Sequence, residues 1–183
     1  NTRQNGYDIS ADVLGYPESY YSPPTEAMDR IEIVRGAASL QYGTQFGGFI
    51  NFKLKDGPKT NAFELVSRQT LGSFGLFNSF NSIGGNHKKL KYYAYYQYKT
   101  GDGWRPNSEF DVHNAHLNLS YQFNAKTSIG FEYTFMNYLA QQAGGLTDFE
   151  FQQDPQQSNR SRNWFKVNWN LLAFHFDHKI SDK

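Results

Sequence analysis

Apolar and polar residues alternate over long segments of the chain from about residue 60 onward. The clearest segment lies at 127–140, where every second residue is apolar: Ile129, Phe131, Tyr133 and Phe135. A period of two is typical of a β-strand with one apolar and one polar face. The pattern predicts six long strands, at 61–73, 75–85, 89–100, 110–123, 127–140 and 162–180.

The connections between these segments mostly alternate in length. Short links at 84–88 and 124–127 contrast with longer ones at 101–109 and 141–160, although the link at 72–75 is also short. Long strands with short turns on one rim and long loops on the other are typical of outer-membrane β-barrels. A soluble antiparallel sandwich or small barrel also fits the strand pattern, so both architectures stay open at this point.

The first 54 residues have a mixed pattern, and turn chemistry at 55–60 separates them from the rest. The elements predicted before this boundary are an irregular loop at 14–24, a helical turn at 23–28 with Thr25 as its cap, a strand at 31–34, a helical turn at 37–41 and a strand at 49–54. In the last strand of the chain, the apolar positions change phase near Leu171. This change predicts a β-bulge there.

Composition narrows the possible functions. Aromatic residues make up 17% of the chain, the formal net charge is +1 and there is no Cys. The absence of Cys excludes a disulfide framework and a thiolate nucleophile, and the near-zero charge gives no support for nucleic-acid binding. The mean hydropathy of −0.71 is low, but a barrel strand needs an apolar residue only at every second position.

Residues that could carry catalysis or bind a metal are scattered. His113 and His116 are three residues apart, as are His175 and His178, and this spacing sends two side chains to opposite faces of a strand. No nucleophile–base arrangement or paired carboxylates stand at a recognisable spacing. The sequence therefore predicts no enzyme activity, no metal site and no cofactor.

Aromatic and polar residues gather in the loop at 16–24, which contains Tyr16, Glu18, Tyr20 and Tyr21. Tyr is a rigid amphipathic contact residue, so this loop is either a ligand platform or a loop packed by its own rings. The pair Trp104-Arg105 in the loop at 101–109 has the same two interpretations. Glu32 lies in the apolar strand at 31–34, and Arg35 follows it, either exposed at the strand end or held by carboxylates. Either residue needs a charged partner if it is buried.

One stretch resembles a known family. Ile31-Glu32-Ile33-Val34-Arg35-Gly36, continuing to Gly43 and followed by Gly47-Gly48-Phe49-Ile50-Asn51, closely resembles the end of the plug domain of TonB-dependent outer-membrane receptors. The stretch from Asn5 to Ile9 is similar to the preceding plug strand, with Asn in place of Asp. Ala37 and the segment 40–48 are similar to the ferric-citrate type of receptor.

The resemblance implies an all-β fold with a small α element in the plug. Residues 1–58 would be the C-terminal part of the plug domain. Residues 59–183 would be about six strands of a presumed 22-stranded, antiparallel transmembrane β-barrel in the bacterial outer membrane. The earlier half of the plug, which contacts TonB, would precede Asn1, and the remaining strands would follow Lys183.

The resemblance also implies a receptor that binds a ferric chelate, either ferric citrate or another siderophore complex, and imports it with energy from TonB. Its partners would be TonB, the chelate and outer-membrane lipid, with no nucleic acid. The residues expected to contact the ligand are Tyr16, Glu18, Tyr20, Tyr21, Gln41, Gln45, Trp104 and Arg105, and those expected to join plug and barrel are Glu32 and Arg35. Two alternatives are the same receptor fold importing a glycan or peptide, and a non-transporting β-sheet module that binds carbohydrate or acts as an adhesin.

Overall fold

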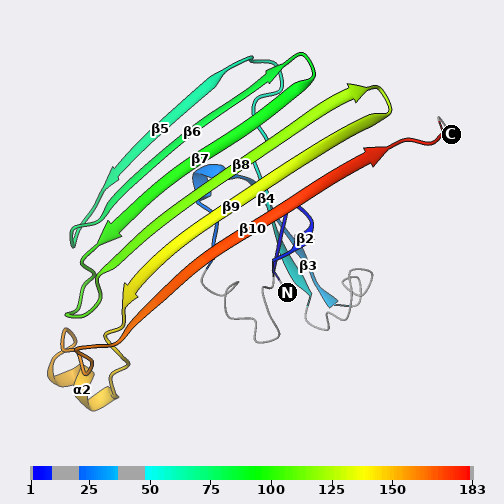
Figure 1. Cartoon of the computed structure of the whole chain (residues 1–183). Coiled ribbons are helices and arrows are strands. Elements are labelled where there is room, and N and C mark those ends of the chain that lie inside the picture. The colour runs from blue at the N-terminus through cyan, green and yellow to red at the C-terminus, as the bar shows by residue number, and fades with distance from the viewer. Residues whose placement is uncertain (1, 10–20, 37–47, 182–183) are drawn as a thin grey trace.

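The computed structural model describes residues 2–9, 21–36 and 48–181, and these residues form two β-sheets (Figure 1). The smaller sheet has the order β2-β1-β4-β3, made of β1 (Thr2–Gln4), β2 (Tyr7–Asp8), β3 (Met28–Val34) and β4 (Phe49–Leu54). The larger sheet has the order β10-β9-β8-β7-β6-β5. Its strands are β5 (Glu64–Leu71), β6 (Phe77–His87), β7 (Leu90–Gly101), β8 (Phe110–Asn124), β9 (Thr127–Gln141) and β10 (Trp164–His178).

The larger sheet is an antiparallel meander in which each strand pairs with the next one along the chain. The prediction of six strands is confirmed, as are the short turns β6–β7 and β8–β9 and the long loops β7–β8 and β9–β10. In Figure 1 the two short turns lie at one end of the sheet and the longer loops at the other. We call these the short-turn end and the long-loop end.

The predicted bulge near Leu171 is wrong. β10 pairs with β9 without a register shift, from Trp164 opposite Gln141 to His178 opposite Thr127. The hydrophobic phase changes because the environment changes along the strand. On the side facing the smaller sheet, Trp169 is buried by packing. On the opposite side, the exposed apolar residues Leu172, Phe174 and Phe176 follow one another toward the short-turn end.

The smaller sheet packs against one face of the larger sheet, which we call the inner face. One apolar cluster joins Ala27 and Leu54 to residues of β6 and β7: Phe80, Tyr93 and Tyr95. A second cluster joins Ile9 and Tyr21 to Met136 and Trp169. Aromatic residues therefore occur on both faces of β7, because one face packs on the smaller sheet and the other is exposed.

Two short helices complete the described structure. A 3-10 helix at Thr25–Ala27 confirms the predicted helical turn, but the predicted Thr25 cap is wrong: Pro24 takes the cap position, and the Thr25 hydroxyl donates to Glu26. The helix α2 (Asp148–Gln153) lies in the β9–β10 loop, where the sequence analysis predicted no helix. The helical turn predicted at 37–41 and most of the loop predicted at 14–24 lie outside the described residues.

The segment 55–63 connects the two sheets and contains the boundary predicted between residues 58 and 59. The division into a plug and a barrel domain at that position stays a prediction. In the described ranges, no helix has both the length and the apolar character required to cross a membrane.

Candidate functional site between the two sheets

A buried carboxylate of the larger sheet accepts hydrogen bonds from the smaller sheet. Glu132 of β9 is 5% exposed. Its Oε2 accepts a hydrogen bond of 2.7 Å from Asn5 Nδ2 and one of 3.0 Å from the Tyr7 hydroxyl. On its other side, Oε1 lies 3.3 Å from His175 Nε2 of β10. The carboxylate of the larger sheet thus accepts two donors from the smaller sheet.

The turn at Asn5-Gly6 places these donors. Both residues have positive φ, +50° and +98°, in the two-residue connection between β1 and β2. Hairpin turns of this kind favour Asn-Gly, because Asn tolerates the left-handed region and Gly has no Cβ. Asn5 Oδ1 accepts the backbone N–H of Leu54 at 2.9 Å, which holds the side chain so that Nδ2 meets the carboxylate of Glu132.

A buried chain of hydrogen bonds continues from this point. Gln4, which is fully buried, donates from Nε2 to the Tyr7 hydroxyl at 2.8 Å and to Thr134 Oγ1 at 2.9 Å. The Tyr21 hydroxyl donates to Gln4 Oε1 at 2.6 Å. Thr134 Oγ1 also lies 2.9 Å from His116 Nδ1. Since a buried polar group without a partner costs about 1–3 kcal/mol, this network fixes how the two sheets meet.

The buried hydroxyls of Tyr7 and Tyr21 remain protonated at neutral pH. Burial raises the pKa of Tyr7 well above its usual value, and the negative charge of Glu132 raises it further. Burial also raises the pKa of Tyr21, with a second contribution from Tyr95. Both groups therefore act as neutral hydrogen-bond donors across the interface.

A cavity of about 400 Å³ lies between the segment 22–26 and the inner face of the larger sheet. Its wall on the sheet is formed by Asn78, Gln97, Lys99, Val112, Asn114, Met136 and Tyr138. Three amides in this wall form a ladder, in which Gln97 Nε2 donates to Asn78 Oδ1 at 2.9 Å and Asn114 Nδ2 donates to Gln97 Oε1 at 3.1 Å. We call this the amide cavity. It combines amide groups with the positive charge of Lys99.

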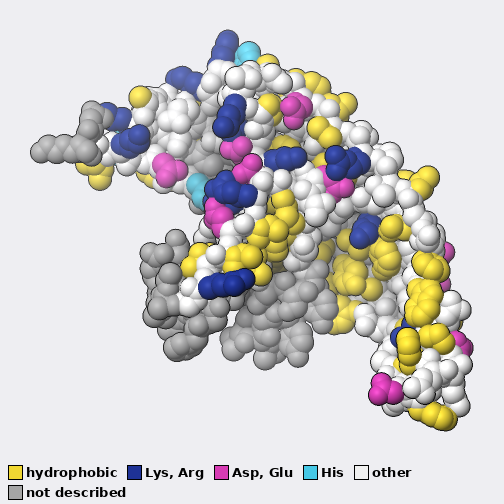
Figure 2. Space-filling view, turned by 180° about the vertical axis from the view of Figure 1, so that it is seen from behind, with side chains coloured by type: hydrophobic (Ala, Val, Ile, Leu, Met, Phe, Trp, Pro, Cys, Tyr) yellow, Lys and Arg dark blue, Asp and Glu magenta, His cyan; other side chains and the backbone are white. Residues whose placement is uncertain are grey.

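A second cavity, of about 500 Å³, lies between the smaller sheet and the inner face of the larger sheet, against strands β7, β8, β9 and β10. Its acidic and basic residues are Asp29, Arg30, Lys53, Asp56, Lys59, Lys91 and Glu132, and His175 also lines it. Figure 2 shows Lys, Arg, Asp and Glu side chains gathered where the two sheets meet. Lys91 pairs with Asp56 of the connecting segment, and Arg30 pairs with Asp29 at 2.7 Å. In the described ranges, no group of three His, Asp or Glu residues is placed to hold a metal ion.

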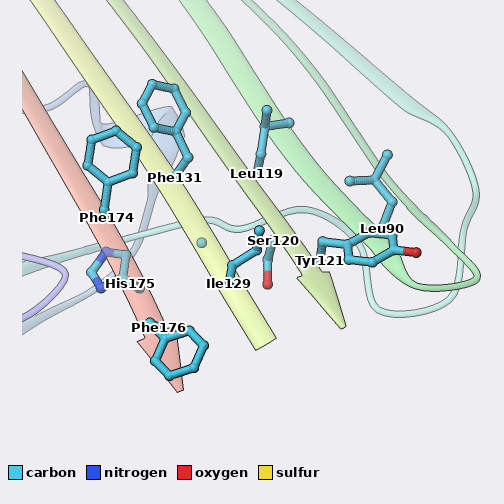
Figure 3. Close-up of a pocket in the computed structure, with 10 residues that line it drawn as sticks. Leu90, Leu119, Ser120, Tyr121, Ile129, Phe131, Phe174, His175 and Phe176 are labelled. Carbon is cyan, nitrogen blue, oxygen red and sulfur yellow. The ribbon is translucent and has the colours of Figure 1, made fainter. Parts of the chain in front are cut away.

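The outer face of the larger sheet is apolar toward the short-turn end. An open groove of about 500 Å³ there is lined mainly by Leu90, Leu119, Tyr121, Ile129, Phe131, Phe174 and Phe176 (Figure 3). The rings of Phe131 and Phe174 lie side by side, with centroids 5.1 Å apart. Phe174 is 78% exposed. We call this exposed apolar surface the apolar belt.

The predicted ligand-contact residues fall into three groups. Tyr16, Glu18, Tyr20, Gln41 and Gln45 lie outside the described residues, so their roles stay predictions. Tyr21 is 2% exposed, and its ring packs edge-on against Trp169 with centroids 4.5 Å apart. This packing places Tyr21 in the interface between the two sheets, and its contact with a ligand stays a prediction.

Trp104 and Arg105 lie in the β7–β8 loop, at the long-loop end. Trp104 is 46% exposed. The Arg105 guanidinium donates to the backbone carbonyls of Gln157 at 2.7 Å and Gly144 at 2.8 Å. Arg105 therefore ties its own loop to the β9–β10 loop, and its contact with a ligand stays a prediction.

The predicted plug–barrel contacts at Glu32 and Arg35 are not seen in the described part of the chain. Glu32 bonds within the smaller sheet, where hydrogen bonds from Asn51 and Arg30 hold its pKa below its usual value. Arg35 is exposed at the end of β3, and no described carboxylate lies within ion-pair distance. Among the described residues, Gln4, Asn5 and Tyr7 bond to the larger sheet, and contacts of Glu32 and Arg35 with other barrel strands stay a prediction.

Comparisons with known proteins were made by sequence and by structure. No family model and no curated protein matches the chain. Among solved structures, the unliganded ferric citrate transporter FecA covers 98% of this chain, with a TM-score of 0.78 and 22% identity. FpvA of Pseudomonas aeruginosa, bound to a heterologous pyoverdine, covers 100% with a TM-score of 0.79 and 18% identity. The ferric-catecholate import receptor Fiu of E. coli K12 covers 99%, with a TM-score of 0.71 and 11% identity.

This chain spans 28%, 26% and 29% of the length of those three proteins, respectively. The resemblance noted in the sequence is confirmed at the level of the fold. The smaller sheet and the six-stranded meander together correspond to a quarter or more of each of these three longer proteins. The chain has the fold of TonB-dependent outer-membrane receptors.

Proposed function

We propose that this chain is part of an outer-membrane receptor that binds a ferric chelate, ferric citrate or another siderophore complex, and imports it with energy from TonB. The smaller sheet would belong to the plug and the larger sheet to the barrel wall. The shared fold supports this proposal, since the similar structures include a ferric citrate transporter and ferric siderophore receptors. TonB would contact a part of the plug that is not in this chain.

The observation that carries the proposal is the amide cavity. It lies against the segment 22–26, directly after the loop whose residues Tyr16, Glu18 and Tyr20 are predicted to contact the ligand. Lys99 belongs to the last residues of β7 before the β7–β8 loop, so its charge is near the long-loop end. A chelate entering from the long-loop end would meet the amide cavity against the plug.

The chemistry of the amide cavity suits the outer atoms of an anionic chelate. Amide N–H groups and an ammonium donate hydrogen bonds to carboxylate oxygens, and charge-assisted bonds are the stronger kind. These groups would recognise the chelator, while the chelator holds the iron.

The apolar belt supports a position in the outer membrane. Barrel strands present apolar residues to lipid at alternate positions, and the exposed rings on β9 and β10 follow this rule. A transmembrane strand needs about 9–11 residues, and β8, β9 and β10 have 15 residues each. The strands are therefore long enough to cross a bilayer and to project beyond it.

Calorimetric titration of the purified full-length receptor with ferric citrate, and with a panel of ferric siderophores, tests the proposal. Lys99→Gln removes the positive charge, and we expect the affinity for the bound chelate to fall about tenfold, or about 1.4 kcal/mol. Lys166→Gln is the matched control, because Lys166 lies on the outer face of β10 and should leave the affinity unchanged. Binding of glycans or peptides in place of every ferric chelate would overturn the ligand class.

A further inference from the structure

The segment that connects the two sheets lies directly on the backbone of the larger sheet. Glycines allow this close approach. A Cβ at Gly85 of β6 would lie 2.2 Å from the backbone oxygen of Ala62, and a Cβ at Gly57 would lie 2.5 Å from the backbone oxygen of Tyr92 in β7. Gly57 also has a φ of +101°, in the left-handed region that favours glycine. Neither position has room for a side chain between the two backbones.

Hydrogen bonds fasten the same segment to β6 and β7. Asn86 of β6 donates twice at 2.8 Å, from its backbone N–H to the carbonyl of Asn61 and from its Nδ2 to the carbonyl of Lys59. The Tyr92 hydroxyl of β7 donates to the carbonyl of Ala62 at 3.1 Å. Three backbone carbonyls of the segment therefore have their partners in the larger sheet.

Two neighbouring residues at the start of the segment bond to different sheets. The N–H of Lys55 donates to the carbonyl of Ala27 at 2.8 Å and its Nζ to that of Glu26 at 2.7 Å, and both acceptors directly precede β3. The carboxylate of Asp56 instead pairs with Lys91 of β7. In the described part of the chain, no hydrogen bond or ion pair joins the residues between Asp56 and β5 to the smaller sheet. The attachment thus changes from one sheet to the other across a single peptide unit.

The surroundings of this peptide unit suit a hinge. On its far side, Pro58 has a fixed φ, and a Cβ at Gly84 would lie 3.1 Å from Pro58 Cδ, so the segment is in close contact with β6. Leu54 and Asp56 line the second cavity, of about 500 Å³, so the peptide unit that joins Lys55 to Asp56 lies next to open space. Hinges are a few loop or element-terminal residues that absorb a change in φ and ψ.

We propose that residues 56–62 form a fixed anchor on the larger sheet, and that the smaller sheet moves about the peptide unit between Lys55 and Asp56. Import past a plug requires the plug to shift or to unfold in part, and for this consequence the proposal rests on the proposed receptor. The anchor stays on the wall while the chain up to Lys55 moves. The moving body therefore ends three residues before the domain boundary predicted between residues 58 and 59.

Single-molecule force spectroscopy of the full-length receptor, reconstituted in a bilayer and pulled at the N-terminus of its plug, tests the proposal. We expect release of the smaller sheet to end at Lys55, and a separate later event to free residues 56–62 before any strand of the larger sheet yields. Seven residues at about 3.5 Å each make this last step about 25 Å long. One event that releases the chain through residue 62, or a last step of another length, would overturn the proposal.

Variants assign the last step to the anchor. Asn86→Ala with Lys91→Ala removes a side-chain hydrogen bond and the ion pair of Asp56, and we expect the last step to merge with the preceding event. Thr60→Ala is the matched control and should keep the step, because the Thr60 hydroxyl donates within the segment, to Asn61. If the double variant does not fold, Asp56→Ala changes an exposed side chain and should lower the force of the step. An unchanged step in these variants would contradict the anchor.

Uptake measurements separate this proposal from the proposed import function. Asp56→Cys with Lys91→Cys introduces two thiols into a chain that has no Cys, and a short bifunctional thiol reagent can join them. We expect the joined receptor to keep at least half of its uptake of the ferric chelate that it binds in the titration panel, whereas a tenfold loss would overturn the anchor. A receptor that takes up no ferric chelate before joining would overturn the import function, and the force measurement would still decide on the anchor.

Discussion

Replacing Tyr7 by Phe removes one hydroxyl from the interface between the two sheets and leaves the ring in place. That hydroxyl donates to Glu132 Oε2 at 3.0 Å and accepts from Gln4 Nε2 at 2.8 Å. Glu132 keeps its bond from Asn5, and Gln4 keeps its bond to Thr134. The substitution therefore weakens the attachment of residues 2–9 to the larger sheet without emptying any packed volume.

The expected magnitude follows from the two lost bonds. A hydrogen bond to a charged group contributes about 1.5–3 kcal/mol and one between neutral groups about 0.5–1.5 kcal/mol. Because both partners retain another bond, we expect a net loss of about 2 kcal/mol for local opening of residues 2–9. At about 1.4 kcal/mol for each factor of ten, opening becomes roughly 30-fold more frequent.

Hydrogen exchange in the full-length receptor measures this opening directly. The backbone N–H of Asn5 donates to Phe52 at 2.9 Å and that of Ile9 donates to Thr2 at 3.2 Å, so both amides report on the segment. Tyr133→Phe is the matched control, since the Tyr133 hydroxyl donates to Asn170 on the outer face. Exchange at Asn5 and Ile9 that stays within threefold of the unmodified receptor would refute the role of this network.

Three further predictions follow from other contacts. The pKa values of Tyr7 and Tyr21 are raised in the folded protein, so their protonated hydroxyls contribute full stability below about pH 10, the usual tyrosine pKa. This stability is lost as the pH rises from there through the raised pKa values. Hydrogen exchange of residues 2–9, corrected for its intrinsic pH dependence, should therefore accelerate above about pH 10. Arg105→Met removes the bonds between the two long loops, and limited proteolysis should cut within 142–163 several-fold faster, whereas equal rates would contradict the role of Arg105. Phe174→Lys places a charge in the apolar belt and should destabilise the receptor folded in vesicles by about 2–4 kcal/mol, with Asn168→Lys as a control that costs about 1 kcal/mol or less.

The sequence predicted the larger sheet well because a period of two directly reports which face of a strand each residue occupies. The same period assigned His113 and His116 to opposite faces, and the structure places His116 inward and His113 outward. The apparent bulge at Leu171 came from assuming that one face is apolar along its whole length. β10 instead passes between environments, so its apolar face changes while its register does not.

The interface between the sheets could not be predicted in the same way. Asn5 and Glu132 are 127 residues apart, and alternation assigns a face but not a partner. Asn-Gly is a turn dipeptide and Glu132 alternates with apolar residues along its strand, but neither pattern identifies the other residue as its partner. The helix α2 had a detectable signal in Thr147 and Glu150, which form a capping box. The bonds from Arg105 to the backbone carbonyls of Gln157 and Gly144 could not be predicted, because a main-chain acceptor has no sequence signature.

The central claim is that successive residues of β9 face hydrocarbon and the barrel interior in turn. The chain has no Cys, so single Cys substitutions from Ile129 to Met136 can each carry a spin label in the full-length receptor reconstituted in vesicles. The account predicts that oxygen relaxes labels at 129, 131, 133 and 135 far more than a water-soluble nickel chelate does, with even-numbered positions shielded from both. Greater access of the nickel chelate at the odd positions, or no alternation at all, would contradict it.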